Sequence, residues 1–414
     1  MKRRRSLGPR FRWLWTAYAV SAFGTWLGFG AFPLLAILVL HAGPTAVSAL
    51  AAVGPAVGAL VAVPLGPWIE FRRKRPVMVW MDVVRFAALI SVPTAYALGW
   101  LGFGQLLVVS VIVAAADIAF TSASGAYLKA LVPPEDLLVA NGRFESTNWT
   151  ATALGPPLGG AAFGLLGPVT TIVANAVSFL LSALGIRAIG GTEPSPAART
   201  ASRLRARDLA EGWRFLFSHP GLRPLFLNVL LFNGLIMGTE PLLAVLMLGQ
   251  LGFTPWQYGL AYAVPCLGGL AGSRLTPRLV ARFGRHTVLW TSGVLRAWWL
   301  LALAFVPAGA GGLGYVMVVE LGLIFFCSVF NPVLATYRLE QFPADRIART
   351  LSAWSVSTKA STAALTALWG LLAGLTGPRV AIGIAGVLVL VTPFLLPRHD
   401  RTPAQPSRTV PSTG

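Results

Sequence analysis

The stretch "GPWIEFRRKRPVMVWMDVVR", residues 66–85, decides the fold. Four cations stand side by side at residues 72–75, in a chain where only 11% of the residues are charged. Long apolar runs flank this cluster on both sides. About twenty apolar residues in a helix cross a hydrocarbon core of roughly 30 Å. The stretch therefore predicts two membrane-spanning helices joined by a short basic loop.

The rest of the chain has the same character. Of 414 residues, 55% are hydrophobic, and the mean hydropathy is +0.70. The net charge of +19 comes from short basic clusters between apolar runs. Because these clusters form no basic domain, we reject a nucleic-acid partner. The composition predicts an all-α polytopic membrane protein.

The apolar runs divide the chain into membrane spans. We expect twelve, at residues 12–40, 46–68, 77–99, 103–128, 139–165, 168–190, 222–249, 255–279, 287–308, 310–336, 349–373 and 376–397. The loops after the first, third, fifth, seventh and ninth spans carry no Lys or Arg, and the next in this series carries only Arg379. The loops on the other side are basic, so the positive-inside rule predicts that both termini are cytoplasmic. We expect a multi-pass protein of the cytoplasmic membrane.

A basic, polar segment divides the spans into two sets of six. We expect an N-terminal bundle at 1–190, a cytoplasmic linker at 191–221, a C-terminal bundle at 222–398 and a disordered tail at 399–414. Within the linker, Leu209, Trp213, Leu216 and Phe217 recur at helical spacing. This pattern predicts a short amphipathic helix on the membrane surface.

The two bundles resemble each other in sequence. Tyr127 corresponds to Tyr337 at an offset of 210, and Arg85 corresponds to Arg296 at an offset of 211. Both matches align a segment at the basic side of the first bundle with a segment at the basic side of the second. The halves are therefore expected to be parallel repeats, related by an axis along the membrane normal.

This organisation resembles the major facilitator superfamily, and the resemblance covers about residues 10–398. The superfamily's G-x-x-x-D-R-x-G-R-R signature is matched by Gly66, Lys74 and Arg75, with Glu70 in the acidic place and departures at Phe71 and Arg73. The Asp82-x-x-Arg85 tract is similar to the branch of multidrug antiporters that includes enterobactin exporters.

The resemblance implies a gate at the cytoplasmic ends of the helices. Acids and cations around the basic loop can bond across the seam between the halves in one conformation and separate in another. The alternative is that the cations only fix the topology. The expected gate residues are Gly66, Glu70, Lys74, Arg75, Asp82, Arg85, Arg282, Gly284 and Arg285.

A second motif concerns the direction of transport. The fifth span fits the antiporter pattern G-x8-G-x3-G-P-x2-G-G at five of six places, with Ala151 at the second glycine. Small residues allow two helices to approach closely, and prolines remove backbone donors. In the resembled family this motif belongs to exporters. The matching residues are Gly142, Gly155, Pro156, Gly159 and Gly160.

Ionisable groups at bilayer depth usually mark a substrate or proton pathway. We expect Glu240 to carry the coupling proton first and Asp117 second, because Gly238 and Pro241 should loosen the helix beside Glu240. Glu320 and Lys359 are expected either to neutralise each other or to serve the pathway, and Lys359 could also face an anionic substrate. Glu145 and Arg143, nearer the cytoplasmic end of the fifth span, complete the candidates.

The sequence thus predicts a secondary transporter rather than an enzyme. The motifs HExxH, GxSxG and the phosphate-binding GxxxxGK[ST] are absent from it. We expect a proton-coupled exporter of a hydrophobic drug-like compound or a siderophore, working by alternating access, with a small-molecule substrate, protons and lipid as partners. No metal or cofactor is expected, and the protein should be monomeric. An importer, a symporter or a lipid flippase on the same fold is the alternative.

Overall fold

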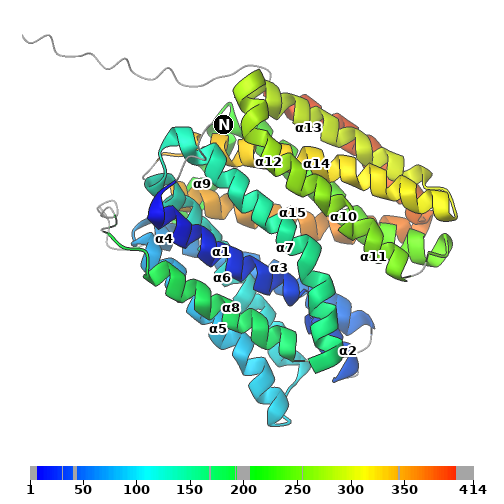
Figure 1. The fold of residues 1–414 in the computed structure, drawn as a ribbon, viewed down its shortest axis with the longest axis horizontal. Coiled ribbons are helices and arrows are strands. Elements are labelled where there is room, and N and C mark those ends of the chain that lie inside the picture. The colour runs from blue at the N-terminus through cyan, green and yellow to red at the C-terminus, as the bar shows by residue number, and fades with distance from the viewer. Residues whose placement is uncertain are drawn as a thin grey trace, which may run out of the picture.

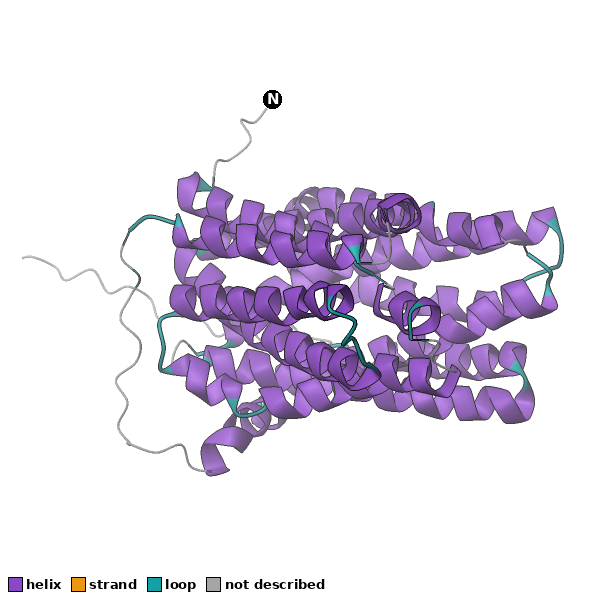
Figure 2. Ribbon diagram, turned by 90° about the horizontal axis from the view of Figure 1, so that it is seen from below, coloured by secondary structure: helices purple, strands orange, loops and turns teal. Residues whose placement is uncertain are grey.

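The computed structural model describes residues 7–29, 31–40, 44–166, 169–191, 193, 206–253, 255–343 and 346–397. Throughout this part of the chain the backbone is helical or irregular, without a strand (Figure 2). The expected fold class is therefore confirmed. The expected disordered tail and most of the basic linker lie outside the described residues.

The described residues of the first half include eight α-helices. They are α1 (Gly8–Leu27), α2 (Ala31–Leu38), α3 (Pro44–Ala62), α4 (Leu65–Glu70), α5 (Lys74–Ala97), α6 (Phe103–Leu131), α7 (Leu137–Leu166) and α8 (Thr170–Arg187).

A separate helix in the linker, α9 (Ala206–Ser218), precedes the second half. The helices of the second half are α10 (Leu222–Ala244), α11 (Pro255–Ala263), α12 (Pro265–Phe283), α13 (Arg285–Ala302), α14 (Ala310–Gln341), α15 (Ile347–Thr376) and α16 (Pro378–Val391). A π-helical turn, Val245–Gln250, follows α10.

These helices accommodate twelve crossings if α1–α2, α3–α4 and α11–α12 each count as one and α9 lies outside the membrane. Among the described residues, seven helical segments are long and apolar enough to cross a membrane on their own. They begin at Lys74, Phe103, Thr170, Leu222, Arg285, Gly311 and Pro378. For the other five crossings, which are broken or more polar, the count remains a prediction.

The two halves lie side by side and meet along one part of their length (Figure 1). Helices α3, α4, α6 and α7 of the first half contact α12, α14 and α15 of the second. The axes of the two halves converge near α4 and α9 and diverge toward α2 and α11 (Figure 1). We call the converging end, which carries the Arg72–Arg75 loop and Arg285, the basic end.

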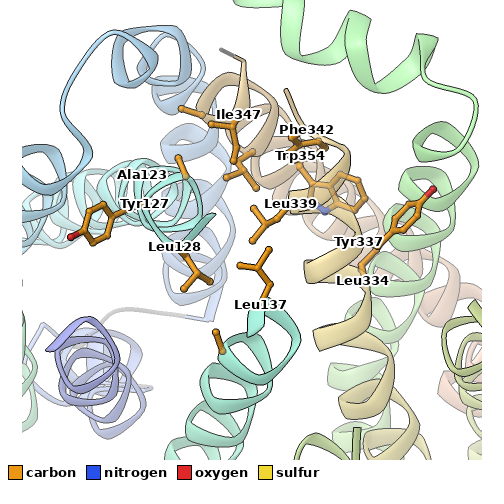
Figure 3. Close-up of a cluster of buried hydrophobic side chains, with 14 of the residues drawn as sticks. Ala123, Tyr127, Leu128, Leu137, Leu334, Tyr337, Leu339, Phe342, Ile347 and Trp354 are labelled. Carbon is orange, nitrogen blue, oxygen red and sulfur yellow. The ribbon is translucent and has the colours of Figure 1, made fainter. Parts of the chain in front are cut away.

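The basic end is sealed by apolar side chains from both halves. Leu128 of α6 and Leu137 of α7 face Leu339 of α14 and Ile347 of α15 (Figure 3). All four side chains are buried. Burial of a leucine or isoleucine contributes about 1.5–3 kcal/mol, so this cluster, the basic-end seal, is a major contact between the halves.

Helix α7 packs tightly on α1 because two glycines of the antiporter pattern line the contact. A Cβ at Gly155 would lie 2.5 Å from the Cβ of Trp26, and one at Gly159 would lie 2.0 Å from the carbonyl oxygen of Leu27. Gly160, by contrast, has open space where its Cβ would be. The glycines thus permit close approach within the first half, and α7 runs unbroken through Pro156.

The linker helix α9 differs from its expected place. The sequence predicts that its apolar face meets lipid, yet Leu216 is fully buried in the protein. The Trp213 indole N–H donates to the Ser357 hydroxyl of α15 across 2.8 Å. A Cβ at Gly212 would lie 2.5 Å from the Arg349 carbonyl oxygen. Helix α9 is therefore docked on the start of α15 at the basic end, while Phe217 remains exposed.

The α1–α7 contact predicts unequal effects for two adjacent glycines. Gly159→Ala should destabilise the protein by about 1–3 kcal/mol, because the new methyl group overlaps the α1 backbone. Gly160→Ala is the matched control and should leave stability unchanged. The midpoint of thermal unfolding of each purified variant in detergent measures the difference. Equal midpoints for the two variants would contradict the observed packing.

Candidate functional site

A cavity of about 280 Å³ lies between the halves, directly beside the basic-end seal. Its walls come mainly from α1, α6 and α7 of the first half and from α14 of the second. Leu128 and Leu339 of the seal line it at one side, together with Leu351. The remaining walls are aromatic and polar, with Tyr18, Trp26, Phe120, Phe144, Asn141, Asn148, Asp117, Arg85 and Arg338 among them. The cavity therefore offers apolar surface together with a few charged groups.

Two charged groups of the cavity wall, Arg85 and Asp117, belong to a series of ion pairs that joins the two halves. Asp82 and Arg85 make a buried ion pair one turn apart on α5. The Arg85 guanidinium lies 3.5 Å from Asp117 on α6, and the Asp117 carboxylate accepts a hydrogen bond from Lys359 on α15 at 3.2 Å. Asp117 is 44% exposed and Lys359 37% exposed, so this last pair is open to solvent.

These ion pairs change two sequence-based interpretations. Asp82 and Arg85 were expected at the gate, but they lie within α5 and bond inside the first half, where Arg85 also lines the cavity. Lys359 pairs with Asp117 of the other half, rather than with Glu320. The physical reason is that α15 packs on α6, which brings Lys359 next to Asp117.

Glu70 is the predicted gate acid that does cross the seam. Its carboxylate accepts hydrogen bonds from the backbone N–H groups of Ala348 at 2.9 Å and Arg349 at 3.1 Å. These groups are free donors because they begin α15, and a helix N-terminus favours an anion. Gly66 supports the contact, since a Cβ there would lie 2.7 Å from that of Ser352.

The neighbouring cations hold the loop together inside the first half. The Lys74 ammonium donates to the carbonyl oxygens of Ile69, Glu70 and Arg72 at 2.7–2.9 Å, which caps the end of α4. Arg75 donates to the Gly191 carbonyl oxygen at 2.9 Å. In the second half Arg285 pairs with Glu340, and Gly284 ends α12 with a positive φ of 81°. Arg282 stacks on Phe283 with its guanidinium 5.4 Å from the ring.

The sequence did not reveal a second acid at the seam. Glu211 of α9 pairs with Arg349 and also with Arg346, the latter at 3.2 Å. Carboxylates from α4 and α9 therefore converge on the first turn of α15. The spacing of α9 shows an amphipathic helix, but not which protein surface its polar edge meets, so no sequence signal identified this contact.

The other intramembrane candidates are dispersed. Glu145 of α7 accepts hydrogen bonds from Trp149 and, across the seam, from Asn331 of α14 at 2.9 Å. Arg143 lies over the Phe11 ring at 5.6 Å. Glu240 is exposed and Glu320 half-buried, and no described cation forms an ion pair with either. Helix α10 stays regular past Pro241, and the irregular turn begins only at Val245.

The repeat is visible in the buried arginines. Arg85 lies 4.5 Å from the Phe120 ring, and Arg296 lies 3.6 Å from the ring of Phe330, 210 residues after Phe120. The partners differ, however: Arg296 donates to the Asn228 side-chain oxygen at 2.6 Å instead of to a carboxylate. The two halves therefore share an arginine–phenylalanine core but not the acids around it.

A family model described as the Major Facilitator Superfamily matches residues 14–327. The chain belongs to the Major Facilitator Superfamily. It is a multi-pass membrane protein with the helical fold of that family's transporters, and the resemblance suggested by the Gly66–Arg75 loop is confirmed.

Similar sequences include multidrug efflux pumps named Tap. The chain is 27% identical over 314 residues to the multidrug efflux pump Tap of Mycobacterium tuberculosis, a match that covers 72% of each chain. It is 25% identical to Tap of Mycolicibacterium fortuitum, covering 72% of this chain and 74% of that protein. This homology places it among transporters related to multidrug efflux pumps.

Solved structures share the fold at low sequence identity. A bacterial homologue of the iron transporter ferroportin in an outward-facing state has a TM-score of 0.81 at 17% identity, covering 94% of this chain and 98% of that one. The human organic anion transporter MFSD10 has a TM-score of 0.79 at 16% identity, covering 94% and 100%. At these identities the likenesses show the fold alone.

The buried Glu70 predicts a pH-dependent stability. Removal from water raises the pKa of Glu70 from 4.5 to about 7, against the opposing effects of Arg349, Lys74 and the Ala348 N–H group. The protonated carboxyl is thus favoured in the folded state. This contribution is complete below about pH 4.5 and is lost as the pH rises to about 7.

Glu70→Gln removes this titration. The unfolding midpoint of the unaltered protein minus that of the variant should therefore fall by a few degrees between about pH 5 and 7.5. Glu340→Gln, which removes an acid that pairs within the second half, is the control and should give no such trend. A difference for Glu70→Gln that stays constant or grows with pH would contradict the burial of this carboxyl at the seam.

Proposed function

We propose that this protein exports an apolar, drug-like compound from the cell in exchange for protons. The observation that carries the proposal is the Asp117–Lys359 ion pair, which joins the two halves at a residue, Asp117, that lines the cavity between them. An acid at this place can bind a proton or a substrate, and either event alters a contact between the halves. An antiporter requires this coupling between the binding of a proton or substrate and the contact of the two halves.

The composition of the cavity supports an apolar compound. Four aromatic rings, those of Tyr18, Trp26, Phe120 and Phe144, line it beside a small number of polar groups. Pockets of this kind bind drug-sized molecules through apolar contact and use few polar groups for orientation. The 27% identity to a protein named as a multidrug efflux pump supports the same substrate class.

The mechanism follows from the seal at one end. In the proposal the basic end faces the cytoplasm and is closed in this conformation, so the cavity serves the outer side. Closure of the diverging ends would break the Glu70 contacts and the basic-end seal, exposing the cavity to the cytoplasm. The two bundles would rock about the level of Asp117, as expected for a rocker-switch transporter.

Two alternatives remain on the same fold. Arg85 and Arg338 also line the cavity, so a siderophore or another anionic compound is the second candidate substrate. An importer or a flippase would use the same architecture in the opposite direction or with a lipid. The direction of dye movement and its response to competing anions separate these functions.

The experiment is ethidium transport in inverted membrane vesicles with an imposed pH gradient. The unaltered protein should accumulate dye only with the gradient. Asp117→Asn should abolish this accumulation, because the amide neither titrates nor holds Lys359. Glu240→Gln tests the acid favoured by the sequence and should retain most of the activity.

The outcomes are distinct. Full activity in Asp117→Asn with loss in Glu240→Gln would transfer the coupling role to Glu240. Dye movement that ignores the gradient would contradict proton coupling. Gradient-driven uptake of dye into right-side-out vesicles would contradict export.

A further inference from the structure

We propose that Lys359 is a tethered counter-ion, which occupies Asp117 in place of an exported organic cation. The inference rests on the proposed function and names its substrate class. The substrate would be an apolar monovalent cation that displaces the Lys359 ammonium from Asp117 and stacks on the aromatic walls of the cavity.

The charge of Arg85 is balanced without Asp117. Arg85 is only 4% exposed and forms an ion pair with Asp82, which is fully buried. The rings of Phe120 and Phe179 lie 4.5 Å and 4.1 Å from its guanidinium, so its position is fixed by packing. Its charge is already balanced by Asp82, and the carboxylate of Asp117 is left for another cation.

The second half of the chain supports this conclusion. At the repeat offsets, Gly293 replaces Asp82 and Cys327 replaces Asp117. Arg296 is nevertheless 1% exposed, and among the described residues its polar partner is Asn228. A buried arginine in this fold is thus accommodated without either acid. Packing of the buried arginine therefore does not require Asp117. We attribute a functional role to this acid in the cavity.

The Asp117–Lys359 ion pair is exposed. The Lys359 Nζ atom lies 3.2 Å from Asp117 Oδ2, and both side chains are more than one-third exposed. An exposed ion pair is worth little net free energy, so another cation can replace one partner. The lysine has a long, flexible side chain, so its ammonium group can move away from Asp117 and remain hydrated.

The surroundings of Asp117 suit a bulky organic cation. Tyr18, Trp26, Phe120 and Phe144 line the same cavity, and aromatic faces attract cations electrostatically. An inorganic cation would gain less, because it would lose its hydration without burying apolar surface. When the organic cation leaves, Lys359 returns to Asp117 and restores the ion pair between the halves.

The inference predicts that removing the tethered cation strengthens binding. Radiolabelled tetraphenylphosphonium is the probe, measured at equilibrium with purified protein in detergent at fixed pH and without any gradient. Lys359→Met, which keeps the length of the side chain, should bind the probe about tenfold more tightly or better, because competition for Asp117 is gone. Arg223→Met removes an exposed cation from the same half and should leave binding unchanged.

A double-mutant comparison tests whether the effect passes through Asp117. Asp117→Asn should weaken binding strongly, and Lys359→Met should then have no further effect in the Asp117→Asn background. Unchanged or weaker binding in Lys359→Met would overturn the inference. So would tighter binding that persists without the Asp117 carboxylate. Binding of the organic anion fluorescein that depends on Lys359 would also overturn it and would favour an anionic substrate.

This experiment is independent of the test of the proposed function. If Lys359→Met tightens cation binding but vesicles show no gradient-driven export, the counter-ion role stands and proton coupling fails. If export depends on the gradient but Lys359→Met leaves cation affinity unchanged, the reverse holds.

Discussion

The closed end of this transporter depends on a carboxylate at the start of a helix. Glu70, at the end of α4, accepts hydrogen bonds from the first free N–H groups of α15, and the first turn of α15 also pairs with Glu211 of the linker helix. Two acids, one from the first half and one from the linker, thus hold one helix terminus of the second half. Behind them, apolar side chains of α6, α7, α14 and α15 exclude water, so the polar contacts and the seal reinforce each other.

A polar chain deeper in the molecule complements this closed end. The line from Asp82 through Arg85 and Asp117 to Lys359 begins in a buried ion pair and ends in an exposed one. Its buried part fixes a charge among aromatic rings, and its exposed part crosses between the halves at Asp117, on the wall of the cavity. The free energy of holding the halves together is therefore sensitive to whatever binds at Asp117. A loss of the Lys359 contact would weaken the seam at the level of the cavity and leave the contacts of the basic end in place.

Much of this architecture could be predicted from the sequence, because the membrane imposes long apolar runs and the basic loops mark one side. The repeat offsets located equivalent residues correctly, as the cores around Arg85 and Arg296 show. Tertiary partners were harder to predict. Residue spacing could not reveal that α15 brings Lys359 to Asp117 or that α9 docks through Glu211. These contacts depend on how helices rotate and pack, which one sequence does not specify. The bond between Asp82 and Arg85, by contrast, has the i, i+3 spacing of neighbours on one helix.

The central claim is that the halves rock about the cavity, so that one end closes as the other opens. Distances between paired spin labels test it directly, in a chain whose Cys266 and Cys327 are replaced by serine. One pair, at Arg72 and Phe283, reports on the basic end, and the other, at Trp100 and Leu375, reports on the opposite end, with all four sites exposed. In Glu70→Ala, which lacks the acceptor for the N–H groups at the start of α15, the first distance should be longer and the second shorter than in the unaltered protein. Distances that change in the same direction, or that do not change at all, would contradict the account.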